Sequence, residues 1–187
     1  MALTVAAGVD QALGYQLAKI TLAVTDTGGI GRAGYLVRMF DGTGGTGAEW
    51  GNATSDASGN AVFYLVEGAY GYQVEKNGAV SGKMALTVTA GVDQALSYQL
   101  GQVTIHVQDS KGTEQPGYLV CIYNGTDGTG SKWGNTTTNA SGDAVFYLVE
   151  GGYQYQVEKG TYKSGRLPVS GFSVTQGATI NFIQTIT

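Results

Sequence analysis

One stretch of sequence occurs twice in this chain, with the second copy 83 residues after the first. Residues 1–17, MALTVAAGVDQALGYQL, return at 84–100 as MALTVTAGVDQALSYQL. The same offset relates EWGNATSDASGNAVFYLVEG at 49–68 to KWGNTTTNASGDAVFYLVEG at 132–151. Near the end of the second copy, SGRLPVSGFSVTQG matches SGKMALTVTAG only if three residues are inserted. A repeat of this length predicts a tandem array of small domains.

The composition is typical of an all-β protein with many tight turns. The 187 residues include 31 Gly, 12 Tyr and 2 Pro, and only 13% are charged, which is too few for a coiled coil or helical bundle. The formal net charge of −4 disfavours a nucleic-acid partner, because phosphate binding needs Lys and Arg. No apolar run approaches the roughly 18 residues of a membrane span, so we expect no membrane insertion.

Alternating apolar and polar residues predict short strands in each copy. KITLAVTD at 19–26 and QVTIHVQD at 102–109 alternate with period two, and turn residues follow each short run. We therefore predict an all-β fold of two antiparallel β-sandwiches, at 18–100 and 101–187. The residues expected in the two cores are Ile20, Leu22, Val24, Phe63 and Leu65, and their copies Val103, Ile105, Val107, Phe146 and Leu148.

The N-terminal segment 1–17 copies the closing strands of a sandwich but precedes the first one. Its apolar residues share the pattern of 84–100, which predicts an extra strand segment with one inward face. These residues are Leu3, Val5, Val9, Leu13, Tyr15 and Leu17. Two explanations stay open: the segment donates a strand to another subunit, or it belongs with a neighbouring repeat of a longer chain.

The run SDASGNAVFYLVEGAYGYQVEK at 55–76 and its copy at 138–159 carry a family resemblance. A turn of the Ser/Thr-Asp-x-x-Gly kind leads into a strand, a Gly-x-Tyr hairpin and a strand ending near Glu. This pattern resembles bacterial Ig-like surface repeats of the collagen-adhesin B-repeat and carboxypeptidase-regulatory-like kind. The resemblance implies Ig-like, prealbumin-like sandwiches in an exported stalk, adhesin or filament subunit.

Many domains of that family carry an intramolecular bond between Lys and Asn or Asp beside a catalytic Glu. Glu75 and Glu158 match the position of that acid. Val24 and Val107 stand where the family has its first-strand lysine, and the resemblance therefore does not extend to the bond in this chain.

The residue pattern predicts neither an enzyme nor a cofactor or metal site. The single His106 lies in mid-strand on the face opposite the apolar residues, which predicts a solvent-facing side chain. The single Cys121 replaces Arg38 and is expected to be an exposed thiol. The turn residues Asp41 and Asp56 become Asn in the second copy, which favours turn capping over calcium binding.

Two tryptophans and four glycosylation motifs are the remaining candidate sites. Trp50 and Trp133 follow the Gly/Thr-rich loops and either stack on a ligand or close one end of a sandwich. The Asn-x-Ser/Thr motif, which marks surface glycoproteins, occurs at Asn52, Asn124, Asn135 and Asn139.

Near-identity of the copies favours a repeatable structural strut. We therefore predict a non-catalytic, extracellular stalk or filament subunit that associates head to tail or with neighbouring repeats. The alternative is an adhesin or carbohydrate-binding module, with surface glycans as partners of the loops around Trp50 and Trp133.

Overall fold

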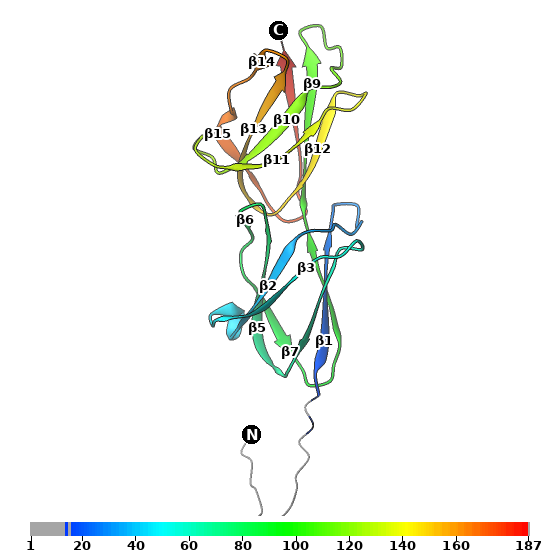
Figure 1. The fold of residues 1–187 in the computed structure, drawn as a ribbon, viewed down its shortest axis with the longest axis vertical. Coiled ribbons are helices and arrows are strands. Elements are labelled where there is room, and N and C mark those ends of the chain that lie inside the picture. Colours follow the sequence, from blue (N-terminus) through cyan, green and yellow to red (C-terminus); the bar gives the residue numbers. More distant parts are fainter. Residues whose placement is uncertain (1–13, 15, 187) are drawn as a thin grey trace, which may run out of the picture.

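Two β-sandwiches are stacked end to end in the computed structural model, which describes residues 14 and 16–186 (Figure 1). Module 1 contains β1 (Ala18–Thr25), β2 (Leu36–Asp41), β3 (Glu49–Thr54), β4 (Asn60–Leu65), β5 (Gly68–Lys76), β6 (Ala79–Val80), β7 (Met84–Val88) and β8 (Gln94–Gln99). Module 2 contains β9 (Gly101–Asp109), β10 (Leu119–Asn124), β11 (Lys132–Thr137), β12 (Asp143–Leu148), β13 (Gly151–Lys159), β14 (Tyr162–Lys163), β15 (Leu167–Val174) and β16 (Thr179–Ile186). A single 3₁₀ turn, Thr43–Gly45, is the only helical element among the described residues.

Each module packs a three-stranded sheet against a five-stranded sheet. In module 1 the small sheet has the order β4-β1-β8, and the large sheet has the order β3-β2-β5-β6 with β7 also paired to β5. Module 2 repeats this arrangement with β12-β9-β16 and with β11-β10-β13-β14 plus β15. The all-β fold of two sandwiches predicted from the sequence is confirmed.

One strand pairing in each module is parallel, in contrast to the purely antiparallel arrangement expected. The last strand, β8, runs parallel to β1, and β16 runs parallel to β9. The strand before it, β7, belongs to the opposite sheet, so the turn after β7 carries the chain across the sandwich. The chain therefore enters module 1 at one end and leaves it at the other.

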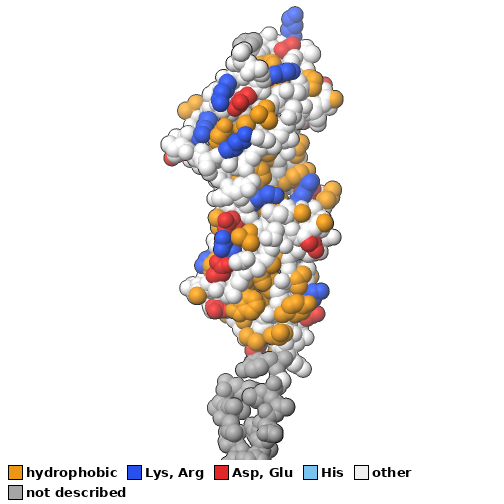
Figure 2. All heavy atoms as spheres, viewed as in Figure 1, with side chains coloured by type: hydrophobic (Ala, Val, Ile, Leu, Met, Phe, Trp, Pro, Cys, Tyr) orange, Lys and Arg blue, Asp and Glu red, His pale blue; other side chains and the backbone are white. Residues whose placement is uncertain are grey.

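Period-two alternation along the strands builds both cores. The ten residues predicted to point inward are all buried, and Phe63 and Phe146 are each 4% exposed. On the face shown in Figure 2, Lys and Arg side chains are interspersed with Asp and Glu side chains.

The prediction that Cys121 is an exposed thiol is wrong. Its side chain is 1% exposed, whereas its copy Arg38 is partly exposed and pairs with Glu49 and Glu75. The thiol is short, and its Sγ stays 4.0 Å from Glu158 Oε1 on the neighbouring strand. An arginine at the same position reaches past its neighbours to the surface.

Candidate functional site at the module junction

The two modules are joined by one residue, Leu100, between β8 and β9. Its side chain is fully buried, and its backbone N–H donates to the carbonyl of Thr25 at 2.8 Å. On the other side of the joint, the N–H of Gln102 donates to the carbonyl of Ala178 at 2.7 Å. The chain thus crosses the junction as one extended segment that is bonded to both modules.

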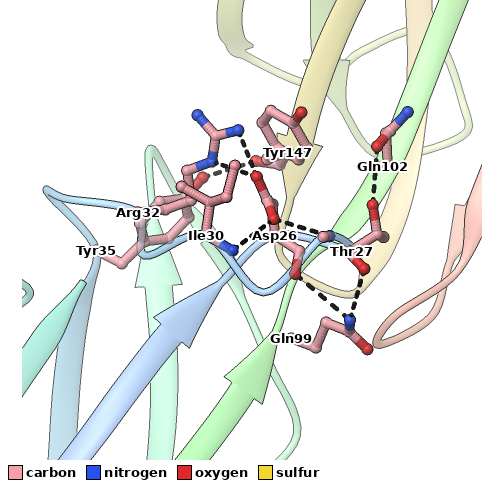
Figure 3. A network of polar contacts seen from close by, with 9 residues as sticks. Asp26, Thr27, Ile30, Arg32, Tyr35, Gln99, Gln102 and Tyr147 are labelled. Carbon is pink, nitrogen blue, oxygen red and sulfur yellow. Dashed lines mark hydrogen bonds and ion pairs between the residues drawn. The ribbon is translucent and has the colours of Figure 1, made fainter. Parts of the chain in front are cut away.

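Asp26 organises the loop of module 1 that faces module 2 (Figure 3). Its Oδ1 accepts hydrogen bonds from the N–H groups of Gly28 and Ile30, and its Oδ2 accepts from Arg32. Burial alone would raise the pKa of this carboxyl, but the bonds from Ile30, Arg32 and Gly28 outweigh burial and lower the pKa below its usual value. Asp26 is therefore ionised at neutral pH and fixes the position of Arg32.

Arg32 and Tyr35 of module 1 both contact Tyr147 of module 2 (Figure 3). The guanidinium carbon of Arg32 lies 3.8 Å from the centre of the Tyr147 ring, a cation–π contact. The hydroxyl of Tyr35 donates to the carbonyl of Tyr147 at 2.7 Å. Burial raises the pKa of Tyr35, so this hydroxyl keeps its proton and remains a donor.

Trp133 is held by the hairpin that follows β5. Its indole Nε1 donates to the carbonyl of Lys76 at 3.1 Å, and its own carbonyl accepts from Asn77 Nδ2 at 2.7 Å. The carbonyl of Asn77 accepts from Asn124 Nδ2 at 2.9 Å. These three bonds join one edge of module 1 to two strands of module 2.

Glu150 of module 2 makes two further contacts with module 1. Its Oε1 accepts from the N–H of Gly82 at 2.5 Å, and its backbone N–H donates to the hydroxyl of Tyr98 at 3.2 Å. Burial raises the pKa of Tyr98 to about 12, so this hydroxyl is neutral under ordinary conditions.

The junction has an apolar interior as well as polar contacts. The buried apolar side chains of both modules, Leu100 among them, form one connected cluster. An open cleft of about 320 Å³ lies beside it, lined by Arg32, Lys76, Trp133 and Asn135 among others. Both cations that line this cleft already lie over aromatic rings: Arg32 lies over Tyr147 of module 2, and Lys76 lies over Tyr35 of its own module.

The two tryptophans of the repeat have different surroundings. Trp133 lies in the junction and packs against the core, whereas Trp50 is 46% exposed at the opposite end of module 1. Of the N-terminal candidates, Leu17 is exposed, while Leu3, Val5, Val9, Leu13 and Tyr15 lie outside the described residues.

The four glycosylation motifs are also spread over different environments. Asn124 bonds to Asn77 in the junction, and Asn135 lines the cleft. Asn52 donates to Glu49, and Asn139 accepts from two backbone N–H groups of its own turn. Asn52, Asn135 and Asn139 are more accessible than Asn124, which is engaged between the modules.

The titratable residues and the two valines singled out in the sequence lie in ion pairs or in the cores. His106 pairs with Asp143 at 2.8 Å on the outer face of β9, and Val24 and Val107 are fully buried. Glu75 pairs with Arg38, and Glu158 pairs with Lys163. Within residues 14 and 16–186, no three His, Cys, Asp or Glu side chains gather as a metal site would require, and no helix is long and apolar enough to span a bilayer.

Sequence reasoning missed the module 1 side of the junction. Arg32, Asn77 and Tyr98 contact module 2, and the repeat is kept at none of the three positions. Module 2 has Gln115, Gly160 and Gln184 at the equivalent positions, the last beside Val107 as Tyr98 lies beside Val24. A break in a near-perfect repeat was therefore the available signal.

No protein-family model matches the chain, and no curated protein matches it. Among solved structures, it is similar to the Bacillus anthracis TIE protein, with 19% identity over 91% of this chain and a TM-score of 0.37. That match spans about a third, 34%, of the TIE protein. It is also similar to the major pilin subunit BcpA of Bacillus cereus, with 9% identity, 91% of this chain, 99% of that chain and a TM-score of 0.39. The shaft pilin SpaA of Lactobacillus rhamnosus GG gives 10% identity, 91% and 98% coverage and a TM-score of 0.38.

Proposed function

We propose that this protein is a non-catalytic structural subunit of an extracellular stalk or filament, in which the two modules form one stiff rod. Repeated sandwiches supply length, and the junction keeps them aligned. The Ig-like surface repeats that the sequence resembles support the extracellular location.

The junction is the observation that carries this proposal. A flexible tandem needs a linker, but here one buried residue separates β8 from β9. Hydrogen bonds lie on several sides of it, from Tyr35, from Asn77 and from Gly82. Bending at the joint would therefore break some of these contacts.

Small-angle X-ray scattering of the whole chain tests the stiffness. We expect one extended shape to fit the wild-type curve. The double substitution Arg32→Gln with Asn77→Gly places the residues of module 2 at the equivalent positions of module 1. It should broaden the distribution of interatomic distances, while the surface control Lys111→Gln should not. A wild-type curve that requires many bent shapes would refute the rod.

Carbohydrate binding is the second candidate function, and the exposure of Trp50 favours it. An indole ring at the end of a module can stack on a sugar face. A glycan array followed by fluorescence titration tests this, with Trp50→Ala expected to abolish any binding and Trp133→Phe expected to keep it. If no glycan on the array binds, carbohydrate binding is excluded and the structural function is the one that remains.

The finer hypothesis is that residues 1–17 donate strands to another subunit. The sequence repeat supports it, since the same residues close module 1 at 84–100. In module 2 the place beside β9 is filled by β16, so a donated strand would add at a free sheet edge. Deletion of residues 2–16 tests it: unchanged assembly and unchanged melting would exclude strand donation.

A further inference from the structure

Among the described residues, the end of module 1 that lies away from module 2 exposes apolar side chains whose copies in module 2 are covered. Leu17, Trp50, Tyr64 and Val66 are 50, 46, 56 and 37% exposed. Hydrophobic side chains gather toward this lower end of module 1 in Figure 2. We name these four residues the end patch. The copies of the end patch lie at the junction: Leu100 and Val149 are fully buried, and Trp133 and Tyr147 are partly buried against the core.

In the junction, residues of module 1 cover the copies of the end patch. The equivalent residues of module 2 lie at the opposite end of the molecule, and several of them are the same. Tyr118 stands where module 1 has Tyr35, and Lys159 stands where it has Lys76. Lys159 Nζ lies 4.5 Å from the centre of the Tyr118 ring, as Lys76 Nζ lies 4.0 Å from that of Tyr35. Gly165 corresponds to Gly82 and follows a serine with the same backbone bonding.

The contacts of the junction can therefore form between two copies of the chain. Tyr64 would offer its carbonyl to the hydroxyl of Tyr118, as Tyr147 does to Tyr35. Trp50 Nε1 would donate to the carbonyl of Lys159, as Trp133 does to Lys76.

The third bond would join Glu67, the copy of Glu150, to the N–H of Gly165, as Glu150 is bonded to Gly82. We propose that the end patch docks on the module 2 end of a second copy, reproducing the junction between molecules. This inference names a contact surface for the filament and in that respect rests on the proposed function.

The contact between copies is weaker than the junction within one chain. Gln115 replaces Arg32, so the cation–π contact is missing, and Gly160 replaces Asn77, which removes one hydrogen bond. Asp41 replaces Asn124 and cannot donate. Three hydrogen bonds are fewer than the roughly ten of a standard interface, and we expect a Kd on the order of 0.1–1 mM. The two ends differ, so the contact does not close and produces open chains.

Sedimentation velocity of the full chain from about 10 µM to about 1 mM tests the docking, a range that brackets the expected Kd. The average mass of wild type should rise with concentration, and Trp50→Ala or Val66→Ser should abolish that rise. Ile183→Ser is the matched control, because Ile183 is 67% exposed beside His106 in the middle of β16 and takes part in none of the junction contacts. All three side chains are surface residues, and unchanged melting confirms that the variants fold.

A gain of affinity provides a second readout. Gln115→Arg restores the arginine that faces Tyr147 in the junction, and it should tighten association about two- to fivefold. Adding Tyr64→Ser to the same chain should remove this gain. In NMR spectra the two indole N–H signals separate the ends: with rising concentration the Trp50 signal should shift, while that of Trp133 stays.

The possible results separate docking between copies from the stiffness of the rod. Wild type that stays monomeric at about 1 mM, or association that survives Trp50→Ala, overturns the docking, whatever the scattering shows. A bent, flexible monomer that still associates through Trp50 overturns the stiff rod alone. Association that disappears when residues 2–16 are deleted also overturns the docking and favours strand donation.

Discussion

Tyr35 and Tyr147 are bonded across the junction, with the hydroxyl of the first donating to the carbonyl of the second at 2.7 Å. The two residues are 112 positions apart in sequence and belong to different modules. Arg32 lies against the ring of the same Tyr147, so this residue of module 2 is held by module 1 at both its ring and its backbone carbonyl.

Tyr35→Phe should cost about 1 kcal/mol of unfolding free energy, because the carbonyl of Tyr147 loses its partner. Urea unfolding of the full chain measures the loss. The matched control is Tyr118→Phe in module 2, since the Tyr118 hydroxyl has no protein partner among the described residues. Equal stability of the two variants would show that the bond contributes nothing.

Phe63→Ala and Phe146→Ala should each cost about 3–5 kcal/mol, since each ring is 96% removed from solvent in its own core and leaves a cavity. Guanidinium chloride unfolding is the measurement. Val145→Ala, on the outer face of β12, should cost less than about 0.5 kcal/mol. Wild-type melting of either phenylalanine variant would contradict the core assignment.

Acid should weaken the fold through Asp26. The pKa of Asp26 is lower in the folded than in the unfolded chain, so its contribution is present above the unfolded pKa near about 4 and is lost as pH falls through the lower folded value. The stability difference between wild type and Asp26→Asn should therefore shrink as the pH is taken from neutral to below about 4. Asp109→Asn is the matched control without an arginine partner, and a smaller pH effect is expected of it. A pH-independent difference for Asp26→Asn would exclude the linkage.

The thiol of Cys121 should react slowly with a disulfide reagent in the native protein and fully in denaturant, because the side chain is buried. A thiol placed at Val169, which is 83% exposed, in a Cys121→Ser background is the accessible control. Immediate native reaction of Cys121 would contradict its burial.

The cores could be predicted from the sequence because burial there follows local alternation. Ile20 and Val103 lie in strands whose apolar residues recur with period two, and the repeat shows each pattern twice. The parallel direction of β8 could not be read in this way. It depends on which sheet the strand joins after the turn, and the alternation is the same in either sheet.

The candidate site could be predicted only in part. Trp50 and Trp133 have nearly identical neighbours in sequence, yet one is exposed and the other is held at a junction. Their difference arises from position in the array, which composition and spacing do not contain. The prediction that Cys121 is exposed was wrong for a related reason. The exposure of its copy Arg38 depends on the length of the arginine side chain and not on the strand face alone.

The parallel pairing of β1 with β8 decides how the rod responds to a pulling force. Load enters module 1 at Ala18, where β1 begins, and leaves it at Leu100, directly after β8, and these two strands lie side by side (Figure 1). Tension along the rod therefore slides β1 against β8, and the hydrogen bonds between them resist together in shear instead of opening one after another. The pair β9 and β16 gives module 2 the same parallel geometry, so tension along the long axis would load both modules in shear.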